Sequence, residues 1–194
     1  MRHAPFVRAV SLVRLTMIAA IGIAFGGGCA ATVNPEQMVP RSLAPAGRRS
    51  EKTVSVAAVT GGAEPNKLVV ELMDQVNIGN AEFRVALIKA LEASGVFREV
   101  LTTETSDYQL DAHIVSQQPQ RAGFLTVTSS FVVNYSIRET GSNREVWRDT
   151  IISHETAEGA PFTEGVPGAM KKSLAGAARQ NLTEMIEKIS RQIQ

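Results

Sequence analysis

The stretch FLTVTSSFVVNYSIR, Phe124 to Arg138, decides the fold of this chain. Successive side chains of a β-strand point to opposite faces, so alternating apolar and polar residues predict a strand with one buried and one solvated face. At about 3.3 Å per residue the strand would run roughly 50 Å, and we expect a bulge near Ser129–Ser130. The expected buried face, apolar except for Ser129, consists of Leu125, Val127, Ser129, Phe131, Val133, Tyr135 and Ile137.

Further strands are expected on both sides of this stretch. Thr53–Val59 is rich in β-branched residues, and Tyr108–Ile114 alternates between apolar and polar residues. Val146–Ser153 follows a glycine-containing loop at 139–143, which is typical of an antiparallel hairpin. Its alternation is poor, so we expect a bulge or an edge position there. Leu68–Met73 is either a short strand or an irregular apolar segment.

Two amphipathic helices are predicted. The first begins with Asn80 as its N-cap, has Glu82 in its first turn and ends at Ser94-Gly95. The second, near the end of the chain, has apolar residues at three- and four-residue spacing, which is typical of a helix facing a core. That apolar stripe consists of Met170, Leu174, Ala177, Ala178, Leu182, Met185, Ile186, Ile189 and Ile193.

The pattern predicts an α+β fold in the order β-α-β-β-β-α. Both helices have a single apolar stripe and the long strand is polar on one side. A two-layer sandwich satisfies these facts, with a mainly antiparallel sheet of about four strands and both helices on one face. We expect a signal peptide at 1–28, a lipidated tether at 29–51 and one domain at 52–194.

The charge distribution argues against nucleic acid as a partner. The net charge is +1, but residues 53–194 contain 13 basic and 17 acidic residues, a net charge of −4. A mildly acidic domain with no evident basic face lacks the electrostatic footprint of a nucleic-acid-binding protein.

The N-terminus predicts export and lipidation. Arg2, Arg8 and Arg14 accompany the short apolar run Leu15–Phe25, which is far below the roughly 20 residues of a membrane span. Gly26-Gly27-Gly28 then precedes Cys29, the only cysteine of the chain. This arrangement resembles the lipobox of bacterial lipoproteins, although Gly26 stands where the lipobox usually has leucine.

The lipobox resemblance implies cleavage between Gly28 and Cys29 and lipid on the sulfur and amine of Cys29. The alternative is an ordinary signal peptide cut near Cys29 or Ala30, which would leave one unpaired thiol in an oxidising compartment. Residues 30–50 contain three prolines and few large apolar residues, so we expect a flexible linker that lets the domain stand off the bilayer. By resemblance to enterobacterial lipoproteins, Ala30 implies sorting to the outer membrane.

No combination of residues predicts catalysis, a cofactor or a metal. His113 and Asp111 would lie side by side on the solvated face, but a zinc site needs three or four ligands. His154 precedes Glu155 at the end of a strand, and Ser129 and Ser130 lie within one. Catalysis requires convergent groups, whereas these residues are isolated in the sequence. We therefore expect a protein that is not an enzyme.

Two surfaces are candidates for binding. The hydroxyl-rich sheet face with Thr126, Thr128, Ser130 and Asn134 could contact a glycan or a protein, although a solvated face is the ordinary meaning of such a pattern. The strand Val146–Ser153, if it lies at an edge, could accept another chain by β-addition.

The chain resembles uncharacterised proteobacterial envelope lipoproteins. The resemblance is carried by GNAEFR at 79–84, by DYQLDA at 107–112, by TVT at 126–128 and by Tyr135. The element order and lipid anchor are also similar to the LPS-assembly lipoproteins, LptE, by architecture alone. These resemblances imply an outer-membrane lipoprotein facing the periplasm that acts as an accessory or assembly factor for an envelope protein. A lipid- or glycan-binding module, using the seam between helices and sheet, is the alternative, and an envelope enzyme is the third.

Overall fold

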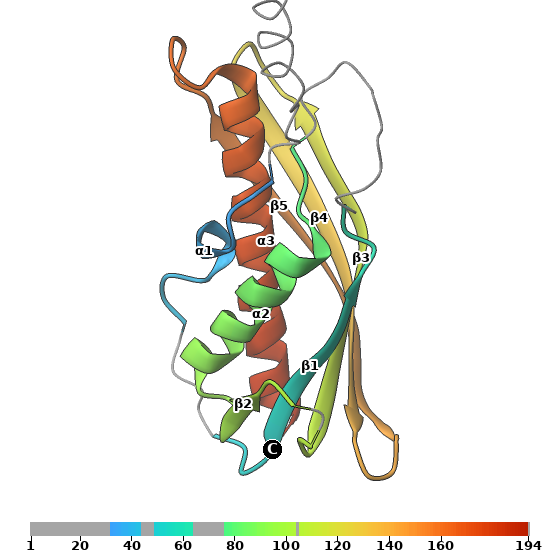
Figure 1. Ribbon diagram of the computed structural model, residues 1–194. Coiled ribbons are helices and arrows are strands. Elements are labelled where there is room, and N and C mark those ends of the chain that lie inside the picture. Colours follow the sequence, from blue (N-terminus) through green and yellow to red (C-terminus); the bar gives the residue numbers. More distant parts are fainter. Residues whose placement is uncertain (1–31, 44–48, 64–75, 104, 194) are drawn as a thin grey trace, which may run out of the picture.

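The computed structural model describes residues 32–43, 49–63, 76–103 and 105–193. It has the predicted α+β architecture, with helices packed against a sheet (Figure 1). The elements along the chain are α1 (Pro35–Met38), β1 (Thr53–Thr60), α2 (Asn80–Ser94), β2 (Glu99–Leu101), β3 (Tyr108–Arg121), β4 (Thr126–Glu139), β5 (Glu145–Glu158) and α3 (Gly165–Gln192).

The strands form one mixed, mostly antiparallel sheet in the order β2-β1-β3-β4-β5. β1 is parallel to both of its neighbours, whereas β3, β4 and β5 are antiparallel to one another. The sheet has five strands where about four were expected. The additional strand, β2, is only three residues long, which is too short to show a periodicity in the sequence.

Three strands of 14 residues dominate the sheet. At about 3.3 Å per residue each is roughly 45 Å long. The expected strand at Tyr108–Ile114 continues to Arg121. It does so past a shift in the register with β4 between Ile114 and Ser116. The shift leaves Val115 as an additional residue on β3, so the alternation in the sequence is interrupted while the strand continues.

The bulge expected near Ser129–Ser130 was wrong, since both residues pair in regular register with β3 and β5. β5 has the bulge and the edge position that were predicted for it. Its register with β4 shifts at Val146, and it pairs with β4 alone. β4 is the central member of the three long strands.

Helix α2 has the predicted length but a different N-cap. Gly79 is the N-cap, and Asn80 is the first helical residue; its Oδ1 accepts a hydrogen bond from the Gly62 backbone N–H at 2.8 Å. The predicted end is confirmed, because Gly95 adopts the left-handed conformation (φ 61°) that closes many helices. Phe83 is fully buried and meets Phe131 of β4 edge to face, with ring centroids 5.3 Å apart.

Helix α3 has 28 residues, about 42 Å at 1.5 Å per residue, so it spans nearly the whole length of the sheet. Leu174, Leu182 and Met185 are fully buried, as the predicted stripe requires. Gly176 lies so close to the Glu155 side chain of β5 that a Cβ atom there would collide with it. The small residue therefore allows helix and sheet to approach closely.

Both long helices cover the same face of the sheet (Figure 1). Along β4, residues 127 to 137 alternate without exception between buried and more exposed side chains. The buried set contacts the helices, and the other face of β3, β4 and β5 is not covered by any helix of the described residues. This open face confirms the predicted two-layer arrangement.

The segment expected to be a linker packs against the domain where it is described. Val33 and Met38 are fully buried in the main hydrophobic core. Val33 donates its backbone N–H to the Asn77 carbonyl at 3.2 Å, and Arg179 of α3 donates to the Gln37 carbonyl at 2.7 Å. From residue 32 to 43 the chain is therefore part of the body rather than free linker. Leu68–Met73 lies outside the described residues.

Candidate functional site

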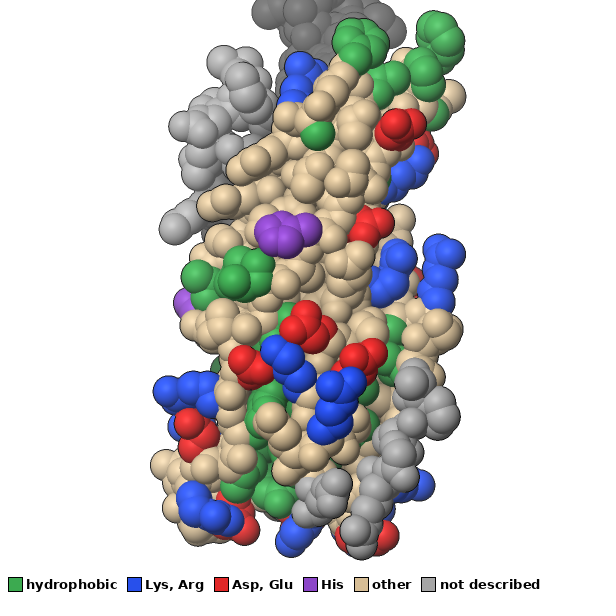
Figure 2. Space-filling model, turned by 180° about the vertical axis from the view of Figure 1, so that it is seen from behind, with side chains coloured by type: hydrophobic (Ala, Val, Ile, Leu, Met, Phe, Trp, Pro, Cys, Tyr) green, Lys and Arg blue, Asp and Glu red, His purple; other side chains and the backbone are tan. Residues whose placement is uncertain are grey.

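An apolar row crosses the open face of the sheet near its middle. Ile152 of β5 pairs with Val132 of β4, and Val132 pairs with Ser116 next to the bulge residue Val115. Val115 and Ile152 are 51% and 56% exposed, and Val132 is half-buried between them. Three adjacent strands thus present neighbouring apolar side chains to solvent, and the row ends at the β5 edge. Figure 2 shows hydrophobic side chains on this face, beside histidine.

Polar side chains flank the apolar row on both sides. Toward the β3–β4 turn, the hydroxyls of Thr128 and Thr156 are 2.8 Å apart. On the other side, the Thr150 hydroxyl donates to Asn134 Oδ1 at 2.8 Å. The open face therefore carries the predicted residues Thr126, Thr128, Ser130 and Asn134, although several of their polar groups are engaged with neighbours. Uncharged polar groups around an apolar centre are typical of a surface that contacts another macromolecule.

A shallow depression lies on the open face between the apolar row and the far end of the sheet. Its volume is about 400 Å³, and its lining includes Asp111, His113, Arg148 and Thr150. Arg138 forms an ion pair with Asp111, so the negative charge of this carboxylate is already balanced by a neighbouring positive charge. The depression offers both hydrogen-bond donors and hydrogen-bond acceptors in a solvent-accessible position.

The free edge of β5 borders the same face. Its first half has the Val146 bulge and charged side chains in ion pairs, Arg148 with Glu145 at 2.6 Å and Asp149 with Lys188 at 2.9 Å. Bulges and charges are the usual protection of an edge against another strand. The second half, Thr150–Glu158, contains His154, Glu155 and Glu158 as ionisable side chains, but it pairs with β4 without a bulge. This half is the less protected part of the edge.

The two candidate histidines lie apart. Both are exposed, His113 on β3 and His154 on β5, with β4 between them. Their partners on β4, Asn134 and Ser130, are four residues apart, about 13 Å along the strand. His113 Nδ1 is within 2.9 Å of the Thr60 hydroxyl, and Asp111 is paired with arginine. The predicted pair of His113 and Asp111 is thus engaged with other partners.

No cluster of three or more potential metal-ligating side chains occurs among the described residues. Ser129 is fully buried, with its hydroxyl 2.7 Å from that of Ser173 on α3, while Ser130 is half-buried on the open face. The two serines therefore point to opposite faces. In the pairing with β5, Ser130 lies opposite His154 and Ser129 opposite Glu155, so each serine has one of these groups beside it but not both.

A buried polar network joins α3 to β4 and β5 on the covered face, and sequence patterns gave no sign of it. The Tyr135 hydroxyl donates to Asn181 Oδ1 at 2.7 Å, and Asn181 Nδ2 donates to the Ile151 carbonyl at 2.9 Å. The Ser153 hydroxyl donates to the Ala177 carbonyl at 2.8 Å. Burial raises the pKa of Tyr135 far above its ordinary value, because the phenolate would lose its hydration. The network holds the helix in register with the strands.

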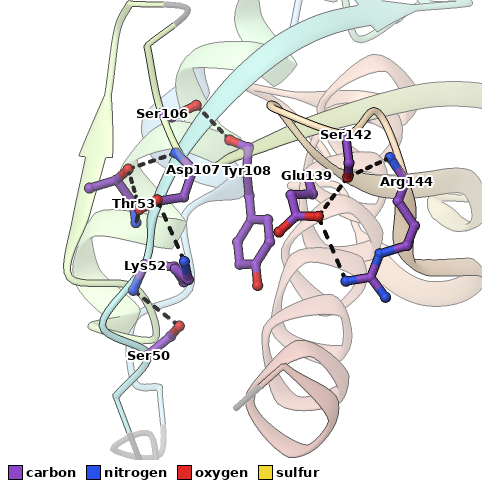
Figure 3. A network of polar contacts seen from close by, with 9 residues as sticks. All are labelled: Ser50, Lys52, Thr53, Ser106, Asp107, Tyr108, Glu139, Ser142 and Arg144. Atoms are coloured by element: carbon purple, nitrogen blue, oxygen red, sulfur yellow. Dashed lines mark hydrogen bonds and ion pairs between the residues drawn. The ribbon is translucent and has the colours of Figure 1, made fainter.

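A second polar network lies at the end of the molecule that contains the β4–β5 turn (Figure 3). The Thr53 backbone N–H and hydroxyl donate to the Asp107 carboxylate at 2.8 and 3.0 Å, and Lys52 Nζ lies 3.7 Å from it. These hydrogen bonds from Thr53, more than the nearby positive charge, lower the pKa of Asp107. An open depression of about 540 Å³ adjoins this network. On its opposite side, the Ser142 hydroxyl donates to the Glu139 carboxylate at 2.6 Å. The network ties the start of β3 to β1.

The residues that carry the lipidation prediction, Gly28 and Cys29, lie outside the described residues, as does Ala30. Lipidation and cleavage there stay predictions. Within the described residues, no helix combines the length and the apolar character needed to cross a membrane.

Comparison with known proteins shows the fold. No family model and no curated protein matches the sequence. A Xanthomonas campestris protein described by the family model DUF330 has a similar structure, with a TM-score of 0.58, 16% identity and coverage of 84% of this chain and 97% of that protein. At that identity the likeness concerns the fold alone.

Two further structures are more distant. A Chlamydia trachomatis hypothetical protein has a TM-score of 0.49 and 9% identity, covering 74% of this chain and 98% of that one. A Neisseria meningitidis lipoprotein has a TM-score of 0.42 and 9% identity, covering 74% of this chain and 99% of that one. The expected resemblance to the LPS-assembly lipoproteins stays a prediction.

Proposed function

We propose that the protein is a lipid-anchored accessory lipoprotein of the bacterial envelope that binds a protein partner through the open sheet face and the adjoining β5 edge. The anchor would be Cys29, and the location would be the periplasmic side of the outer membrane. The observation that carries the binding proposal is the row Val115, Val132 and Ile152, which is exposed beside the less protected half of an edge strand.

The apolar side chains on the open face of the sheet favour binding of a protein partner over catalysis. Burial of a large apolar side chain is worth about 1.5–3 kcal/mol, yet the fold leaves Val115 and Ile152 more than half exposed. A partner strand at Thr150–Ala157 would gain main-chain hydrogen bonds and would place side chains over this row. The polar surroundings would supply the rim of such an interface.

The proposal is tested by photocrosslinking in intact cells. A photoreactive amino acid replaces Ile152, and the matched control carries it at Val85, which is 41% exposed on α2 and lies away from the open face. We expect a discrete protein adduct from position 152 and none from position 85. Equal adducts from both positions, or none from 152, would contradict the proposed interface.

The anchoring part has a separate test. Cys29→Ser is compared with the wild type for membrane attachment after washing with high salt, and the mature N-terminal peptide is weighed by mass spectrometry. We expect acyl mass on Cys29 in the wild type and release of the variant from membranes. Firm attachment of the variant would refute lipid anchoring while leaving the crosslinking result intact.

A glycan is the second candidate ligand, favoured by the depression next to the apolar row. Its lining combines Asp111, Asn134 and Arg148 with hydroxyl and imidazole groups, which are the donors and acceptors that sugar hydroxyls require. Binding of envelope glycans measured by calorimetry, for the wild type and for Asn134→Ala, tests this candidate. Heat that is identical for both proteins would exclude the depression as the site.

A further inference from the structure

Two phenylalanines at one end of the molecule are almost completely exposed. Phe124 lies in the turn between β3 and β4 and is 91% exposed, and Phe162 lies between β5 and α3 and is 100% exposed. Large aromatic side chains on loop tips bury no surface within the protein, so they do not stabilise the fold. Their exposure is unusual enough to indicate a contact outside the chain.

The two loops lie side by side. The Gly159 backbone N–H donates to the Leu125 carbonyl at 3.0 Å, and Thr126 pairs with Glu158 at the end of the sheet. Figure 1 shows both loops at the upper end of the molecule, and Figure 2 shows exposed hydrophobic side chains at that end. Phe124 and Phe162 thus share one tip, which we name the phenylalanine end.

The N-terminal part of the chain joins the body at a defined level of the sheet. The Val33 backbone N–H donates to the carbonyl of Asn77. Asn77 lies two residues before Gly79, the N-cap of α2. Between them, Ile78 donates its backbone N–H to the Gln117 side chain of β3 at 2.7 Å. Val33 is therefore held close to the level of Gln117.

The covalent distance from Cys29 to this level is short. Four Cα steps separate Cys29 from Val33, which limits their separation to about 14 Å. Gln117 is four residues from Arg121, where β3 ends, or about 13 Å along the strand. A lipid on Cys29 can thus reach little further than the phenylalanine end. The expected long linker is not available, because Val33 and Met38 are buried in the core.

We propose that the phenylalanine end docks on the lipid bilayer, with Phe124 and Phe162 inserted at the level of the headgroups and the sheet standing away from the membrane. The proposal rests on the lipid anchor of the proposed function and adds the orientation of the body. Aromatic side chains favour the membrane interface. In this orientation the β4–β5 turn, roughly 45 Å away along β4, would face the periplasm.

Charge contributes little to this docking. Residues 121–126 and 158–172 together contain Arg121, Lys171 and Lys172 against Glu158 and Glu164, an excess of one positive charge. Lys172 is also paired with Glu164. Attraction to anionic lipid would be small and screened, so we expect docking to persist in high salt.

The test uses the intact lipoprotein in vesicles of phosphatidylethanolamine and phosphatidylglycerol, with and without doxyl-labelled lipid. Single cysteines replace Phe124, Phe162, Val85 or Ser142, and each carries an environment-sensitive fluorophore. Ser142 lies in the turn at the opposite end and Val85 on the helical side. We expect blue-shifted, strongly quenched emission at positions 124 and 162, and unquenched emission at positions 85 and 142.

Flotation of the vesicles and the number of fluorophores per chain separate the possible failures. Protein that floats with one fluorophore but is equally quenched at 85 and 124 lies on its side, which overturns the docking proposal alone. Protein that floats without quenching at any position also overturns the docking alone. Protein that stays at the bottom with two fluorophores has a free Cys29 thiol, which overturns the anchor and the docking together.

A second set of variants tests the phenylalanines themselves. Phe124→Ser and Phe162→Ser are combined in a chain labelled at a cysteine replacing Thr163, which is exposed beside Phe162. Both phenylalanines are exposed, so the fold is expected to be unaffected. We predict loss of quenching with unchanged flotation. Quenching equal to that of the same label beside intact phenylalanines would show that they do not hold this end on the bilayer.

Discussion

The two faces of the same sheet have opposite chemistry although they alternate residue by residue along one strand. On the covered face, Phe131 and Tyr135 are buried beneath α2 and α3, and the Tyr135 hydroxyl donates to Asn181. On the open face, Val132 and Asn134 lie among hydroxyls, amides and the exposed Ile152. The side chains of the covered face therefore hold the fold together, whereas those of the open face are accessible to solvent and form the proposed contact surface. Substitutions of neighbouring residues therefore test the separation directly.

The largest expected effect is at the centre of the covered face. Phe131→Ala should reduce the free energy of unfolding by about 3–5 kcal/mol, because it leaves a cavity against Phe83. The neighbouring Val132→Ala should cost less, about 1 kcal/mol, since Val132 is only half-buried and loses mainly strand propensity. Denaturant unfolding of both variants gives the comparison. Similar losses at both positions would contradict the division between faces.

Met38→Ala should have the next largest effect, about 2–5 kcal/mol, because its side chain is fully buried. A residue of a free linker would contribute nothing. The adjacent Gln37 is exposed, and Gln37→Ala serves as the control for α1. An unchanged unfolding midpoint for Met38→Ala would show that residues 33–38 are not part of the covered face's core.

Asn181→Leu should cost about 1–3 kcal/mol, because it removes the partner of the buried Tyr135 hydroxyl. The control is Gln180→Leu, one residue away on the exposed side of α3, expected to change stability by about 0.5 kcal/mol or less. Thermal unfolding of the two variants is compared. A loss for Gln180→Leu as large as for Asn181→Leu would refute the role of the buried network.

The smallest effect is the pH dependence at Asp107, outside both faces. The folded state lowers the pKa of this carboxyl, so its contribution is complete above the unfolded pKa of about 3.9 and is lost as the pH falls below it. The side chain is 38% exposed, which keeps the effect small. Unfolding of wild type and Asp107→Asn should differ at neutral pH and converge in acid. A constant difference would contradict this linkage.

The covered face was largely predictable because burial imposes a period on the sequence. The alternation from Val127 to Ile137 and the stripe of α3 both follow directly from one-sided packing. The extension of β3 was missed because the bulge at Val115 breaks the alternation. Burial of Val33 and Met38 was missed because two apolar residues among prolines have no period.

The candidate site was less predictable because it depends on contacts between distant residues. The polar residues of β4 were predicted to face solvent, but the apolar row across three strands requires their register. Ile152 is exposed through the edge position of β5, which the sequence left open between an edge and a bulge. The pairing of Tyr135 with Asn181 joins residues 46 positions apart, and no local pattern indicates it.

The most direct test of a separate contact face is the photocrosslink from position 152 in chains that carry Val132→Asp. We expect the discrete adduct of the unsubstituted chain to disappear, because a carboxylate in the apolar row would oppose burial by a partner. Unfolding measured on the same preparation should remain cooperative, with a smaller loss of stability than Phe131→Ala gives, because Val132 is only half-buried. An adduct of undiminished yield in the Val132→Asp chain would contradict the account.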